Sequence, residues 1–133
     1  MRLRGEHTGG RLALIENVLP AGFGGMPLHV HPGFDEAFYV LDGGLTFRVG
    51  DEVAAAGPGA LVYAPGDVPH TFAELTGRRA RVLLWTTPAG HERYFDEMAD
   101  ALEGGADLSP EFFAPLWARH GITNVGSPDP LRA

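Results

Sequence analysis

The chain has 133 residues, a length that suits one domain with a proper hydrophobic core. Its net charge of −7 argues against binding to nucleic acid or to an anionic membrane surface, and the absence of cysteine excludes disulfides, thiolate zinc sites and cysteine nucleophiles. The first ten residues lack the apolar stretch of a signal peptide, and no apolar run approaches the roughly 20 residues that span a bilayer, so we expect a cytoplasmic protein.

The 19 glycines and 11 prolines punctuate short apolar segments, a pattern typical of a β-rich barrel or sandwich. After a polar arm over residues 1–10, we predict eight strands at spacings of roughly ten residues. These strands cover residues 11–18, 29–31, 36–41, 45–49, 52–56, 60–64, 70–75 and 80–87. The Asp42-Gly43 pair between two apolar runs is a strong hairpin signal. The sequence therefore predicts an all-β fold, an antiparallel barrel or jelly roll over about residues 11–87 of a single domain, residues 1–133.

The C-terminal segment, about residues 91–121, changes from strand to helix patterning. Residues 91–102 carry an apolar stripe at helical spacing, which Gly104-Gly105 ends. A second short helix begins with Ser109 as N-cap and Pro110 in the first position, and it ends at Gly121. Its apolar face consists of Phe112, Phe113, Leu116 and Trp117, and Pro115 is predicted to kink or split it. We expect both helices to cover the barrel or a subunit interface rather than to form a ligand lid.

Three histidines and one glutamate are the candidate metal ligands. On a strand, residues i and i+2 point to the same face about 6.6 Å apart, so His29 and His31 can converge on one ion. The Pro32-Gly33 turn lets the chain fold back and bring Glu36 to the same point, and His70 comes from a later strand. An isolated His-x-His pair is more often a surface or core feature than a metal site, so the prediction depends on all four residues together.

The spacing of these residues resembles two sequence motifs of the cupin family. Residues 29–43 read HxH, four residues, Glu, six residues, Gly, which is similar to the first motif, and Gly59, Pro65 and His70 are similar to the second. The resemblance covers about residues 11–87 and implies a small metal-binding β-barrel with one or two short C-terminal helices. It also implies the metal ligands His29, His31, Glu36 and His70.

The chain departs from the two motifs at three places, none of which is a ligand. Phe23 stands where the first motif begins with glycine, and Asp67 stands where the second has glycine, with Gly66 displaced by one. Glu74 replaces the closing asparagine. Strand parity with His70 would turn Glu74 into the barrel, but a strand-end position that reaches solvent is the expectation we favour, because unpaired acids are seldom buried.

Parity also predicts a substrate pocket. Phe38 and Val40 share the inward face of Glu36, Phe47 lies on the apolar face of the next strand, and Phe72 lies beside His70. Met26 and Tyr63 are candidates for the mouth of this pocket. We expect an apolar cavity that suits a flat or apolar organic molecule, and the alternative is that these side chains only fill the barrel.

Imidazole and carboxylate ligands suit one divalent transition ion per chain, Fe, Mn, Ni, Co or Zn, with coordination positions left open for a substrate. The cupin resemblance implies, first, a quercetinase-type dioxygenase, in which the ion binds an enolate or phenolate oxygen of a small organic substrate and Glu36 is ligand, proton acceptor or both. The second interpretation is a non-redox cyclase, similar to polyketide cyclases, or isomerase, and the third is a small-molecule-binding module without catalysis. The resemblance also implies a homodimer formed through edge strands, for which residues 1–18 are the candidate edge.

Overall fold

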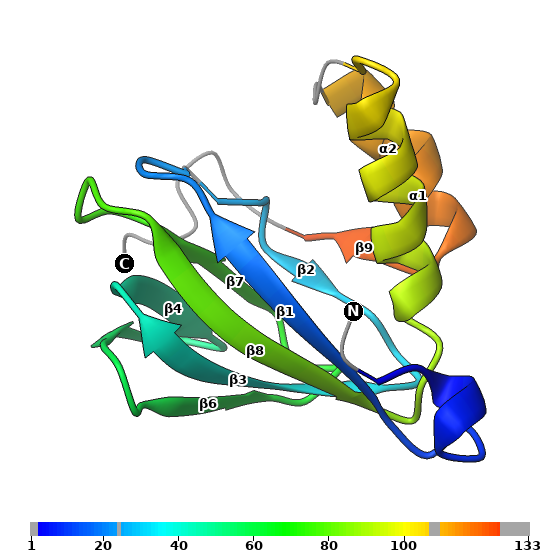
Figure 1. Cartoon of the computed structure of the whole chain (residues 1–133), viewed down its shortest axis with the longest axis horizontal. Helices are drawn as coiled ribbons and strands as arrows, with labels where there is room; N and C mark the ends of the chain where they lie inside the picture. Colours follow the sequence, from blue (N-terminus) through cyan, green and yellow to red (C-terminus); the bar gives the residue numbers. More distant parts are fainter. Residues whose placement is uncertain (1–2, 24, 107–109, 126–133) are drawn as a thin grey trace.

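The computed structural model describes residues 3–23, 25–106 and 110–125. Two antiparallel sheets face each other, and two helices stand at one end of them (Figure 1). The first sheet has the order β1 (Ala13–Leu19), β8 (Ala80–Thr87), β3 (Asp35–Asp42) and β6 (Leu61–Ala64). The second has the order β5 (Glu52–Ala56), β4 (Leu45–Val49), β7 (His70–Ala73), β2 (His29–Val30) and β9 (Thr123–Asn124). The predicted all-β barrel or jelly roll is confirmed.

Each of the eight predicted strands is present, close to its predicted bounds. The additional strand β9 extends the second sheet by pairing with β2, with Asn124 opposite His29. A two-residue strand carries no alternation that a sequence could display, so no pattern pointed to β9.

Alternating apolar residues of β3 and β8 form the wall of the first sheet. Phe38 lies opposite Leu84 and Val40 lies opposite Val82, and all four side chains are at most 1% exposed. Phe47 of β4 reaches across from the second sheet, with its ring centroid 5.2 Å from that of Phe38. Burying side chains of this size stabilises the fold by about 1.5–3 kcal/mol each. The two sheets are therefore closed around a packed apolar interior.

The helices α1 (Glu92–Glu103) and α2 (Pro110–Arg119) pack against each other beside β2 and β9 (Figure 1). Tyr94 of α1 and Trp117 of α2 are buried together, and the Trp117 Nε1–H donates a hydrogen bond of 3.1 Å to the Tyr94 hydroxyl oxygen. Pro115 lies inside α2 without splitting it, contrary to one of the two outcomes expected for this proline. The burial of Leu116 and Trp117 at the next two positions offsets the one backbone hydrogen bond that a proline removes. Ser109, the predicted N-cap, lies outside the described residues.

The N-terminal arm is tied down on α1. It contains a short 3₁₀ helix, η1 (Gly5–His7), whose Gly5 N–H donates to Glu92 Oε2 over 2.7 Å. The Arg4 guanidinium forms two hydrogen bonds with the Asp96 carboxylate, of 2.7 and 3.1 Å. Within the described part of the chain, neither helix is long and apolar enough to cross a membrane.

Glu74 corrects the expectation of a solvent-facing strand end. Its side chain is 0% exposed and accepts hydrogen bonds from the Gly22 N–H at 2.7 Å and the Thr76 N–H at 2.7 Å. The Gly77 N–H at 3.1 Å and the Thr76 hydroxyl are further donors. These hydrogen bonds, foremost that of the Thr76 hydroxyl, lower the pKa of Glu74 to about 2. Glu74 thus joins the loop after β1 to the loop after β7 as a carboxylate.

Candidate metal centre

The four predicted ligands come together between the two sheets. His29 of β2 and His70 of β7 are direct cross-strand partners in one sheet, and Glu36 projects from β3 of the other. His31 follows β2 at the start of the turn that leads to β3. The ligand atoms of these four side chains all lie within 4.8 Å of one another. The fold thus brings residues from three strands and one turn to a single point.

Each of the three imidazoles has its Nδ1 held by a backbone carbonyl. His29 Nδ1 lies 2.8 Å from the Pro27 oxygen, and His70 Nδ1 lies 2.9 Å from the Val68 oxygen. His31 Nδ1 lies 3.2 Å from the Phe34 oxygen. A carbonyl only accepts, so each Nδ1 carries the proton and each neutral ring turns the lone pair of Nε2 toward the centre. This arrangement of a ligating histidine with its other nitrogen anchored is the usual one in metal sites.

The separations between the ligand atoms suit one ion. His31 Nε2 and His70 Nε2 are 2.9 Å apart, and His70 Nε2 is 3.1 Å from Glu36 Oε1. Ligands at about 2.0–2.2 Å from a metal and at right angles to each other are separated by about 3 Å. Two neutral imidazoles whose lone pairs face each other at this distance need a cation or a proton between them. The residues present therefore fit a divalent ion with imidazole and carboxylate ligands.

The protonation of the cluster also favours cation binding. Burial alone would raise the pKa of Glu36, but hydrogen bonds from His31 and His70 outweigh it and hold that pKa below its usual range. Burial lowers the pKa of His29 to about 4, and the neighbouring His70 adds to this effect. Burial would also lower the pKa of His31, but the hydrogen bond with Glu36 raises it overall. A proton shared between His31 and Glu36 accounts for the pKa shifts of these two groups, and it occupies the place that a cation would take.

Aromatic side chains that the sequence did not single out for the site enclose the centre. The Phe34 ring stacks on His31 at a centroid distance of 4.1 Å, and Trp117 of α2 lies 5.2 Å from His29. His91, just before α1, lies between Phe34 at 4.7 Å and Tyr94 at 5.0 Å. His91 is 7% exposed, and burial lowers its pKa to about 4. The helical pair therefore closes the end of the barrel over the metal ligands.

The residues predicted to line a substrate pocket lie partly in the apolar core and partly at the surface. Phe38, Val40 and Phe47 are at most 3% exposed, and Phe72 packs against the same core. Phe38, Val40 and Phe47 therefore belong to the packed core of the barrel, whereas Phe72 is only partly buried. Tyr63 is 56% exposed and pairs with Ala37 on the outer face of its sheet, away from the centre.

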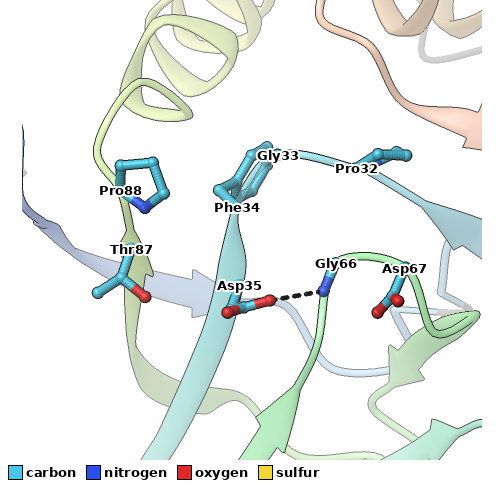
Figure 2. A pocket seen from close by; sticks show the side chains of 8 residues that line it. All are labelled: Pro32, Gly33, Phe34, Asp35, Gly66, Asp67, Thr87 and Pro88. Carbon is cyan, nitrogen blue, oxygen red and sulfur yellow. Dashed lines mark hydrogen bonds between the residues drawn. The ribbon is translucent and has the colours of Figure 1, made fainter.

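On the described part of the protein, the two best-defined hollows are lined by residues other than the four candidate ligands. The larger, about 640 Å³, is lined by Met26, Pro27, Phe113 and Trp117 among others, and Trp117 separates it from His29. The smaller, about 350 Å³, lies beside Phe34 and Asp35 (Figure 2). Met26 thus lines a hollow that shares Trp117 with the surroundings of the least buried candidate ligand, His29.

Gly66 explains the altered turn before His70. Its carbonyl accepts a hydrogen bond of 2.9 Å from the His31 N–H, and its own N–H donates to Asp35 Oδ1 over 2.9 Å (Figure 2). A Cβ at this position would lie 2.1 Å from the Phe34 oxygen and 2.7 Å from the His31 oxygen. Only glycine allows this close approach, which fixes the backbone of two site residues.

Comparison with known proteins gives a family match and several similar structures. The cupin domain family matches residues 16–86, more than half of the chain. The structure of TT1209 from Thermus thermophilus is 33% identical over 59% of this chain and 74% of that chain, with a TM-score of 0.55. No curated protein matches the chain significantly.

Two further similar structures have names that state an activity. The DMSP lyase DddQ from Ruegeria pomeroyi is 29% identical over 59% of this chain and 39% of that chain, with a TM-score of 0.53. A sugar phosphate isomerase of the cupin superfamily from Silicibacter pomeroyi is 25% identical over 62% and 55%, with a TM-score of 0.54. The chain spans only part of both of these proteins.

Proposed function

Since the chain belongs to the cupin domain family, we propose that it is a metal-dependent enzyme with one divalent transition ion held by His29, His31, Glu36 and His70. The observation that carries this proposal is the approach of His31 Nε2 and His70 Nε2 to 2.9 Å while both Nδ1 atoms face carbonyls. A structural zinc site is closed by its four protein ligands and contributes only to stability. A five- or six-coordinate ion held by four protein ligands keeps one or two coordination positions open for a substrate.

The reaction we propose is non-redox and acts on a small molecule that carries a carbonyl or carboxylate oxygen. Bound at this site, the ion supplies a Lewis acid for that oxygen. Glu36 remains ionised and holds the negative charge of the site, and the three anchored imidazoles keep its geometry fixed. Phe34, Trp117 and His91 exclude bulk water from the centre.

The packed interior is what favours this chemistry over a reaction on a large flat substrate. Phe38, Val40 and Phe47 leave no room in the barrel for a flavonol-sized ring system. The DMSP lyase and the sugar phosphate isomerase, two similar structures at 25% identity or more, both have non-redox names. Small, oxygen-rich substrates of these two kinds are the class we propose.

A dioxygenase acting on a small enolic substrate is the second candidate. The almost complete burial of Glu36, His31 and His70, at most 4% exposed, favours it, because reactions with oxygen profit from a site closed to water. The two candidates differ in their need for oxygen.

The deciding experiment compares turnover with and without oxygen. Protein freed of metal is reloaded with Zn²⁺, Mn²⁺ or Fe²⁺, and DMSP, sugar phosphates and small enolisable acids are followed by NMR under nitrogen. Turnover with Zn²⁺ or Mn²⁺ in the absence of oxygen supports the non-redox proposal. Oxygen uptake that depends on Fe²⁺, with no anaerobic turnover, would replace it by the dioxygenase, and saturable binding without turnover in any condition would leave a binding module.

We propose further that the chain acts as a homodimer joined along β1. This strand is an edge of its sheet, and beyond its pairing with β8 it forms an isolated bridge between Leu14 and Leu3. Val18 near its end is 51% exposed. Sedimentation equilibrium should give twice the mass of the 14.2 kDa chain, and a Val18→Lys variant should shift the protein toward monomer.

A further inference from the structure

Thr86 is a buried hydroxyl with nothing to bond. Its side chain is 0% exposed, and among the side chains of the described residues its Oγ1 is the one buried nitrogen or oxygen without a hydrogen-bond partner. Buried polar groups are nearly always paired, because an unpaired one loses its bonds to water without replacement. The exception therefore calls for a partner that is not part of the chain.

The sheet register places this hydroxyl next to the metal ligands. Thr86 of β8 lies directly opposite Glu36 of β3, and both side chains point between the sheets. Side chains at directly opposed positions have their Cβ atoms about 4.5–5.5 Å apart. The outer neighbours in this row have small side chains: Ala13 lies opposite Thr86, and Ala64 lies opposite Glu36. Thr86 is thus the polar group of the first sheet that lies closest in register to Glu36.

Thr86 forms no side-chain hydrogen bond with the candidate metal ligands. No hydrogen bond links it to Glu36, whose Oε1 is shared by His31 and His70. In the same strand, every other inward position is apolar, namely Ala80, Val82 and Leu84. A valine would fill the same volume as threonine here, so packing alone gives no reason for the hydroxyl.

From this geometry we propose that Thr86 is a positioning residue that donates a hydrogen bond to an oxygen atom of the molecule bound beside Glu36. The ligand class is an oxyanion or carbonyl compound, since a threonine hydroxyl donates one hydrogen bond and its natural partner at a cationic centre is an anionic oxygen. This inference rests on the proposed metal site and adds a specific contact for its substrate.

The test uses protein loaded with Co²⁺, whose visible absorption reports both the ion and its ligands, and acetohydroxamate as the oxygen-donor probe. Thr86→Val should take up Co²⁺ like the wild type and keep its thermal stability, but it should bind acetohydroxamate roughly ten-fold or more weakly. Thr86→Ser should restore the affinity. The matched control is Thr71→Val, which removes a buried hydroxyl that does have a partner, the Met26 oxygen at 2.7 Å. This control should lower thermal stability and leave acetohydroxamate affinity unchanged.

The outcomes separate the two proposals. Equal acetohydroxamate affinity in wild type and Thr86→Val would overturn the role of Thr86 while leaving the metal site intact. A Thr86→Val variant that loses Co²⁺ affinity or unfolds early would also overturn it, because the hydroxyl would then act on Glu36 or on the fold. Failure of the wild-type protein to bind Co²⁺ would instead overturn the metal site itself.

Discussion

The Nε2 atoms of His31 and His70 lie 2.9 Å apart, and the other nitrogen of each ring is held by the carbonyl of a nearby turn or loop residue. The two histidines are 39 residues apart in sequence, and they come from the turn after β2 and from the start of β7. The backbone carbonyls of Phe34 and Val68 set the tautomers of the two rings. The backbone therefore fixes the orientation in which the two Nε2 atoms face each other. The backbone around Phe34 and Val68 therefore sets the geometry of the candidate site.

Removing one of these ligands should abolish tight metal binding. We expect His70→Ala and His29→Ala each to lower the affinity for Zn²⁺ more than about 100-fold, since loss of an outer partner alone costs roughly 10–100-fold. The circular dichroism spectrum should remain that of a folded β-protein, because the apolar interior does not depend on the ligands. Elemental analysis and competition with a chelator measure the change.

The control for this experiment is His7→Ala. His7 lies in η1, where its Nδ1 accepts a hydrogen bond from the Arg4 N–H over 3.0 Å, remote from the four ligands. The His7→Ala variant should retain the metal content of the wild type. Full retention of metal in both ligand variants would contradict the site.

Metal binding should raise the thermal stability of the protein. An ion that binds only the folded chain adds about 2.7 kcal/mol at a concentration roughly 100 times its Kd, which corresponds to a Tm increase of roughly 10 °C for a domain of this size. Differential scanning calorimetry with Zn²⁺, then with excess EDTA, should show the increase and its reversal. His70→Ala should show neither the increase nor its reversal. An unchanged Tm of the wild type on addition of Zn²⁺ would contradict binding to the folded state.

The sequence was sufficient for most of the fold and for the grouping of the four candidate ligands. Alternation of apolar residues has period two in strands such as β8, so the predicted bounds came close to the observed ones. The His-x-His spacing and the Pro32-Gly33 turn tie three ligands to one short segment, and local geometry alone brings them near each other.

The rest depends on contacts between distant segments. Glu74 has its face set by parity, but one of its hydrogen-bond donors is the Gly22 N–H, 52 residues earlier, which no local pattern reveals. Whether Phe38 and Phe47 line a cavity or fill it depends on the distance between the sheets, which alternation does not encode. Thr86 was within reach of the sequence, as the single polar residue on the inward face of its strand.

Gly66→Ala should damage the site through the backbone. The added methyl group would meet the Phe34 oxygen at 2.1 Å and the His31 oxygen at 2.7 Å, so the turn has to move. We expect the free energy of unfolding to fall by about 2 kcal/mol or more and the affinity for Zn²⁺ to fall with it. Urea denaturation and metal titration measure the two effects. Gly57→Ala, with no atom within 4 Å of the added methyl, is the control and should behave like the wild type, and a Gly66→Ala variant that did the same would refute the close approach.

Glu74→Gln should make the protein less stable at neutral pH but not in strong acid. The pKa of Glu74 is lowered to about 2 in the folded protein, from 4.5, by the hydrogen bonds of Thr76 and Gly22. A lowered pKa means that the folded state binds the proton less readily than the unfolded state, so the stabilisation is complete above about pH 4.5 and is lost as the pH falls toward 2. A glutamine lacks the charge and presents an amide N–H₂ to donors, so it forfeits this contribution at every pH.

The free energies of unfolding of wild type and variant, measured in urea from neutral pH down to about pH 2, should therefore converge as the pH drops. Glu52→Gln on the exposed strand β5 should differ from wild type by no more than about 0.5 kcal/mol, and a constant gap between wild type and Glu74→Gln across this range would show that Glu74 acts by shape and not by charge.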